Sequence, residues 1–129
     1  MDFHDRYTWA EILFGDRRYT LAAKELESLL ADVAAEQTPV RGLGEARQLL
    51  ARAHFHAAHL VRAEETAREI LADNPVDAYA ALLLYRSLER QSRHEEAARA
   101  RTLAAVLGAP GMSWEDDEDT SDASDRATD

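Results

Sequence analysis

The sequence predicts an all-α chain built from pairs of helices. Ala, Leu and Arg supply 55 of the 129 residues, and all three are strong helix formers. Glycine (5) and proline (3) are scarce. Apolar residues recur at intervals of three and four, as on one face of a helix. With 46% hydrophobic residues, a chain of this length can form the core of one domain.

Two helices are expected before the first long loop. The first covers residues 5–14, where apolar residues recur at helical spacing: Trp9, Leu13 and Phe14. Glycine and aspartate at positions 15 and 16 end it. The second covers residues 19–34, with one apolar face: Ala22, Leu26, Leu29, Leu30 and Val33. Residues 37–44 contain one proline and two glycines and predict a loop.

Four further helices follow. The third and fourth are expected at about 45–58 and 61–72. Asn74 is expected to cap the fifth helix, because Pro75 suits the first helical position and Asp77 favours the positive end of the helix dipole. This helix runs to about Gln91. The sixth runs from about 94 to 107, where Gly108 and Pro110 stop it.

The chain ends in an acidic segment, which sets a boundary after residue 110. Residues 111–129 hold eight acids and one Arg, a net charge of −7 out of a total of −10. Few apolar residues are present, so we expect this tail to be disordered. Trp114 is followed by five acids. An aromatic anchor before acids is typical of a docking segment, and a purely solubilising tail is the alternative.

The last two helix pairs repeat with a period of 34 residues. Leu83 falls on Leu49, Leu84 on Leu50, Arg86 on Arg52, and Ala97 on Ala63. These residues, with Ala51 and Pro75, resemble the pattern of the tetratricopeptide repeat family. The first pair matches more loosely, through Trp9, Ala10, Tyr19 and Ala22, with seven residues inserted at 37–44. The resemblance implies about three antiparallel pairs stacked as a short right-handed superhelix over residues 1–110.

The resemblance also implies a concave groove for a peptide, lined by the first helix of each pair. The positions carried over are Tyr7, Glu11, Phe14, Gln48, Arg52, Phe55, His56, Tyr79, Leu82, Arg86, Glu89 and Arg90. Their aromatic residues offer contact area, and their arginines can pair with carboxylates. The alternative is that these arginines are solvated, or paired with Glu11 and Glu89.

Several other classes of protein are disfavoured. The absence of cysteine excludes disulfides and thiolate metal sites. No phosphate-binding loop, HExxH or GxSxG motif is present, so neither an enzyme nor a cofactor is expected. His54 and His56 point about 160° apart on a helix while His56 and His59 share a face, so we expect no metal site. The acidic charge argues against nucleic acid or anionic membrane as the main partner.

Together these features predict a protein-interaction module or adaptor that binds a partner protein or peptide in the groove. Its own acidic tail is a second candidate ligand. The alternative is a structural or oligomerising helical module with no peptide ligand, for which a homodimer is possible. No targeting leader or apolar run of membrane-spanning length is visible, so a cytoplasmic location is expected. The sequence does not identify the partner or its pathway.

Overall fold

A computed structural model describes residues 2–37 and 39–111, and helices are the only regular secondary structure in this part of the chain. The all-α prediction is therefore confirmed. None of the helices in this part is long and apolar enough to span a membrane. Residues 112–129 of the predicted disordered tail lie outside the described residues. The six helices are α1 (Phe3–Gly15), α2 (Tyr19–Glu36), α3 (Leu43–His56), α4 (Leu60–Asp73), α5 (Ala78–Arg90) and α6 (His94–Val106).

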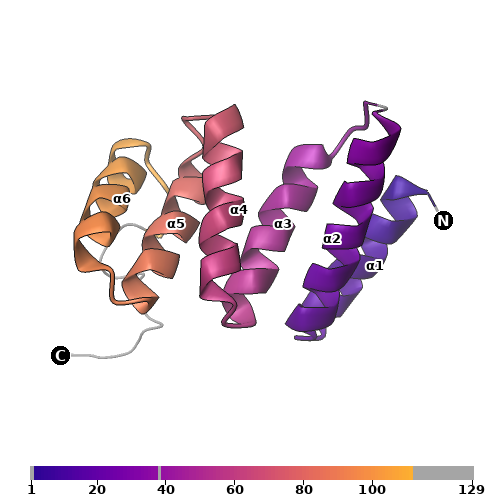
Figure 1. Ribbon diagram of the computed structural model, residues 1–129, viewed down its shortest axis with the longest axis horizontal. Helices are drawn as coiled ribbons and strands as arrows, with labels where there is room; N and C mark the ends of the chain where they lie inside the picture. The colour runs from indigo at the N-terminus through magenta and orange to yellow at the C-terminus, as the bar shows by residue number, and fades with distance from the viewer. Residues whose placement is uncertain (1, 38, 112–129) are drawn as a thin grey trace.

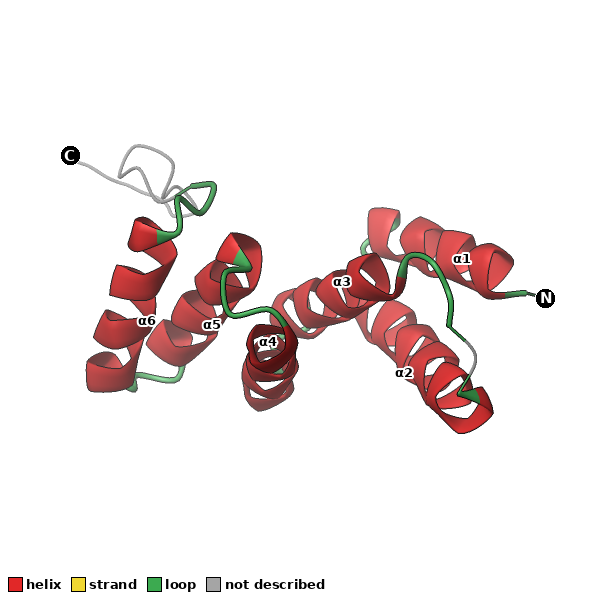
Figure 2. Cartoon of the chain, turned by 90° about the horizontal axis from the view of Figure 1, so that it is seen from above, coloured by secondary structure: helices red, strands yellow, loops and turns green. Residues whose placement is uncertain are grey.

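The helices form one row in chain order, so that each packs against the next (Figure 1). Seen from above, α1, α3 and α5 lie toward one side of the row, and α2 and α4 lie toward the other (Figure 2). Weaker contacts join α1 to α3 and α3 to α5. The odd-numbered helices therefore share a continuous face.

The turn inside each helix pair repeats the same backbone geometry. Arg17, Ala58 and Ser92 all adopt left-handed φ values, of 63°, 64° and 61°. The next residue in each turn donates its N–H to a carbonyl five residues back, as His59 does to His54 at 2.8 Å. The three turns are 41 and 34 residues apart. The 34-residue period and the seven-residue insertion are therefore present in the backbone. We call residues separated by these intervals equivalent.

Equivalent ion pairs fasten the first two helix pairs. Arg6 Nη1 lies 2.7 Å from an Asp32 oxygen, and Arg47 Nη1 lies 2.6 Å from an Asp73 oxygen. Each ion pair links the start of the first helix of a helix pair to the end of the second helix. Each exposed ion pair contributes little to the stability of the fold. These contacts therefore fix how the two helices are aligned more than they stabilise the fold.

The start of α5 differs from the prediction. Asp77, rather than Asn74, is the N-cap, and its carboxylate accepts the N–H of Ala80 at 3.0 Å. Asn74 instead begins the preceding turn, where its carbonyl accepts the N–H of Asp77 at 3.1 Å. Asparagine and aspartate cap helices equally well. The extended backbone of Asp77 (φ −74°, ψ 100°) decides between them, because it directs the carboxylate at the first turn.

The core divides into two clusters of buried residues. One is formed by α1, α2 and α3, and the other mainly by α4, α5 and α6, with Ala51 of α3. Ala22, Ala63 and Ala97 occupy equivalent positions, and all three are buried as expected. Trp9 was expected on the apolar face of its helix, but it is 44% exposed.

The crossing of α3 and α4 gives a test of this packing. Ala63 has no exposed surface, so Ala63→Leu should overpack the contact and destabilise the fold by about 1–3 kcal/mol. Ala72→Leu is the matched control, because Ala72 lies exposed on the same helix. Denaturant unfolding measures both variants. Equal stability of Ala63→Leu and the parent chain would show that the helices do not cross at this alanine.

Candidate functional site

The predicted groove residues come from α1, α3 and α5, which the fold places along one face. Most of them are partly or fully exposed on this face. Leu82 is the exception, because it is 7% exposed and belongs to the core. It supports the face from beneath and offers no surface to a ligand.

Aromatic rings and arginines make a connected cluster on this face, which we call the arginine–aromatic cluster. Phe14 and Tyr19 lie with ring centroids 5.0 Å apart, and His56 stacks on Tyr19 at 4.9 Å. Phe55 continues the chain of rings beside His56 at 5.7 Å. The members are Phe14, Tyr19, Arg52, Phe55, His56, Tyr79 and Arg90.

Arg52 links the three helix pairs at the centre of the cluster. Its guanidinium carbon lies 4.7 Å from the ring centroid of Phe14 on α1 and 6.0 Å from that of Tyr79 on α5. Cation–π contacts of this kind engage the face of the planar guanidinium, and its N–H donors lie in the plane of the group. The Arg52 Nε is buried and has no hydrogen-bond partner among the described residues.

Two more arginines extend this positive surface. Arg90 lies over the Phe55 ring at 5.1 Å from the centroid. Arg86 is equivalent to Arg52, one repeat further along. It lies beside the end of the described chain, since a Cβ placed on Gly111 would be 3.9 Å from its Nη2. The residues that follow α6 therefore return to the face carried by α5.

The carboxylates of this face interact with tyrosines. The Tyr85 hydroxyl donates to Glu89 at 3.2 Å. Burial raises the pKa of Tyr7, and the Glu11 and Glu45 carboxylates raise it further, while Arg52 lowers it. Arg52 and Arg90 contact aromatic rings, and among the described residues neither forms an ion pair with Glu11 or Glu89.

The histidines are arranged differently from the prediction. His54 is 1% exposed, and its Nε2 lies 3.0 Å from Glu27 of α2. Its Nδ1 lies 3.4 Å from the Nδ1 of His59. His59 was expected to share a face with His56, but His56 stacks on Tyr19. The described residues contain no group of three or more possible metal ligands.

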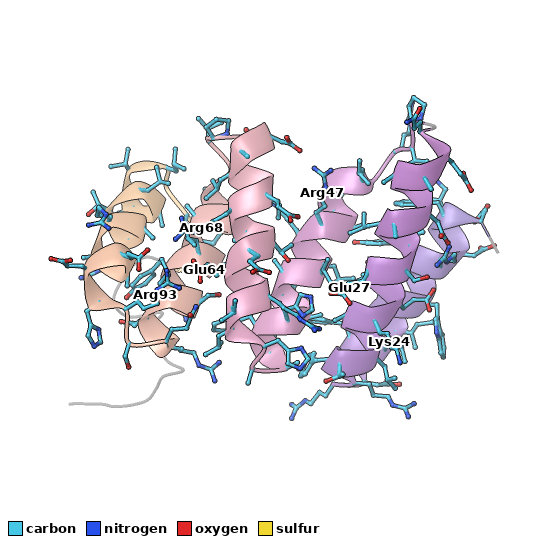
Figure 3. The ribbon with its side chains drawn as sticks, in the orientation of Figure 1. Lys24, Glu27, Arg47, Glu64, Arg68 and Arg93 are labelled. Atoms are coloured by element: carbon cyan, nitrogen blue, oxygen red, sulfur yellow. The ribbon has the colours of Figure 1, made fainter. Side chains whose placement is uncertain are left out.

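A second polar cluster surrounds a buried carboxylate of α4. Glu64 is 7% exposed and accepts from Arg93 at 2.6 Å, Arg68 at 3.0 Å and Gln91 at 3.1 Å (Figure 3). Burial raises the pKa of Glu64, but these hydrogen bonds outweigh it and leave the pKa lowered. The carboxylate is fully satisfied, so this cluster joins α4 to the α5–α6 turn and is not a reactive centre.

Tyr19 is the member of the arginine–aromatic cluster that the groove prediction missed. It is the first residue of α2, whereas the groove positions were carried over only to the first helix of each pair. The sequence did contain a signal for this residue, because Tyr19 comes directly after the turn that follows Phe14. The turn folds the two rings against each other.

Comparison of the chain with protein-family models, with curated proteins and with solved structures finds no match. The tetratricopeptide resemblance and its right-handed superhelix therefore remain predictions from the sequence. The case for a function depends on the cluster itself.

His54 provides a pH test of the α2–α3–α4 contact. Burial, His59 and Arg62 lower the pKa of His54, while Glu27 raises it, and the net pKa is below 6.5. The unfolded chain then binds the proton more readily, so stability should fall as the pH drops below about 6.5. We expect the melting temperature to decline between pH 7.5 and 5.5, and to decline less in His54→Phe.

The control for this test is His94→Phe, which removes an exposed histidine at the start of α6. In this variant the melting temperature should fall with pH as steeply as in the parent chain. If His54→Phe also keeps that slope, the decline does not arise at His54.

Proposed function

We propose that the chain is a non-catalytic interaction module of the tetratricopeptide type, and that the arginine–aromatic cluster binds an acidic segment of a partner protein. The observation that carries this proposal is the placement of Arg52, held between rings from α1 and α5 without a carboxylate partner among the described residues. No cofactor is needed for such binding.

The chemistry of the cluster defines the ligand. A guanidinium held by its faces is already oriented, so less side-chain entropy is lost when its N–H donors meet a carboxylate. The partly exposed rings beside it add apolar contact area. The best ligand is therefore a peptide that places an aromatic side chain next to several acids.

The chain carries a segment with this chemistry in residues 112–129. Trp114 is followed by five consecutive acids. The described chain ends at Gly111 beside Arg86 of α5, the helix that also carries Tyr79 and Arg90 of the cluster. An intramolecular segment competes at an effective concentration in roughly the millimolar range. We therefore infer that the tail and an acidic partner compete for the same face, and that salt weakens both.

The arginines give the first test of this proposal. Replacing Arg52 and Arg86 together with Ala should weaken binding of a labelled peptide that copies residues 112–129, by roughly tenfold if one charge-assisted hydrogen bond is lost. The probe is added to a chain ending at residue 110, and fluorescence anisotropy reports binding. Replacing Arg41 and Arg99 with Ala removes two exposed charges elsewhere and should change little. If both double variants lose the same affinity for the peptide, the effect arises from net charge alone.

The tail gives a second test. Deleting residues 111–129 should strengthen binding of an acidic partner peptide, because the intramolecular competitor is gone. A full-length variant with the eight tail acids changed to Asn or Gln should behave like the deletion. Calorimetric titration at low and high salt measures both. Unchanged affinity after deletion would make the tail a solubilising end, and failure of any acidic peptide to bind would reject the proposed function itself.

A further inference from the structure

The charge at one repeated position of the odd-numbered helices changes sign on α1. Arg52 of α3 and Arg86 of α5 are equivalent, and the equivalent residue of α1 is Glu11, which is exposed. We call these three residues the charge row. Phe14, whose ring lies 4.7 Å from the Arg52 guanidinium carbon, follows Glu11 by one turn of the same helix. The arginine–aromatic cluster therefore has an acid at its α1 edge.

A second carboxylate adds to the negative charge at this edge. Burial is the main reason that the pKa of Tyr7 is raised, the Glu11 and Glu45 carboxylates raise it further, and Arg52 lowers it. These three charged groups therefore lie around the Tyr7 hydroxyl. Both glutamates are exposed, so a ligand that reaches α1 meets negative charge.

The other end of the charge row is positive. Arg86 and Arg90 lie on α5. Glu89 is the only acid of this helix, and it accepts a hydrogen bond from the Tyr85 hydroxyl at 3.2 Å. With Arg52 beside them on α3, a bound segment meets net positive charge over α5 and α3.

The spacing of the helices converts the charge row into a sequence pattern. Helix α3 contacts both α1 and α5, and the axes of contacting helices lie roughly 8–10 Å apart. A polyproline II segment has three residues per turn and rises roughly 3.1 Å per residue, so every third side chain points the same way at steps of about 9 Å. The ligand that fits therefore carries two acids at an interval of three, and a residue that is not acidic at the next interval.

The tail of the chain contains this pattern close to where the described residues end. Gly111 lies beside Arg86, and Glu115 is the first acid that follows it. Steps of three lead from Glu115 to Glu118, and then to Ser121, which lies beyond the run of five acids. Four residues span up to roughly 13 Å, which is enough to bring Glu115 to Arg86.

We propose that the tail crosses this face from α5 to α1, and that Glu11 is a specificity-determining residue that fixes its register. The acids at positions 115 and 118 then lie at Arg86 and Arg52, and Ser121 lies opposite Glu11. Glu11 repels acids, so the cluster selects a segment whose acidic run ends before α1. This inference rests on the proposed function and adds the charge order of the ligand.

A charge cycle between Glu11 and position 121 tests the register. The probe is the labelled peptide that copies residues 112–129, with Ser121 kept or changed to Lys or Glu. The receptor is the full-length chain with its eight tail acids changed to Asn or Gln, with Glu11 kept or changed to Arg. At low salt, Ser121→Lys should tighten binding to the receptor that keeps Glu11 by about two- to fivefold and weaken binding to the Glu11→Arg receptor. Ser121→Glu should have the opposite effects.

Two matched controls make the same changes of charge elsewhere. Glu65 is exposed on α4, on the other side of the row of helices (Figure 2), and Glu65→Arg is the receptor control. Thr128→Lys is the peptide control. Neither should reverse the preference at position 121. If the preference is the same with Glu11 and with Glu11→Arg, the register is wrong while the proposed function stands. If the peptide binds no receptor, both fail.

Disulfide cross-linking tests the same placement within the intact chain. The sequence contains no cysteine, so two introduced thiols report on one pair of positions. Under mild oxidation at low salt, Glu11→Cys with Ser121→Cys should cross-link within the chain several-fold faster than Glu65→Cys with Ser121→Cys. High salt should remove the difference. Equal rates of both pairs at low salt would overturn the proposed path of the tail.

Discussion

The close approach of neighbouring helices at buried alanines is the constraint on which this structure depends. Fourteen of the 25 buried hydrophobic residues in the described part of the chain are alanine, and most of these have no exposed surface. A methyl group adds little apolar area, so each crossing is stabilised mainly by dense contact between helices. Larger residues such as Leu26, Leu29 and Leu88 fill the spaces beside the crossings. The row of helices and the shared face of α1, α3 and α5 follow from this packing.

Much of the fold could be predicted because its signals are local. Helical spacing of apolar residues and the breaks at Gly15 and Gly108 locate the helices to within a few residues. The 34-residue repeat identifies equivalent positions without any coordinates. The start of α5 was misplaced because Asn74 and Asp77 both suit a cap, and only the backbone between them distinguishes the two.

The remaining features depend on contacts between residues far apart in the sequence. Glu27 reaches His54 across 27 residues, and no local pattern connects them. Arg52 was correctly placed on the odd-numbered helices, but its contacts with Phe14 and Tyr79 arise only when three helix pairs are stacked. Helical periodicity indicates that Trp9 lies on an apolar face. It does not indicate whether another helix covers that face.

The division of the core into two clusters has a consequence for synthesis of the chain. The first cluster needs Leu49 and Leu50 of α3 as well as α1 and α2. The first helix pair therefore cannot complete its core when it leaves the ribosome, and it must wait for about 20 more residues that include the long connection before α3. Once α3 has emerged, every later helix finds its neighbour already folded. Folding then proceeds with the chain, through contacts between segments that are close in sequence.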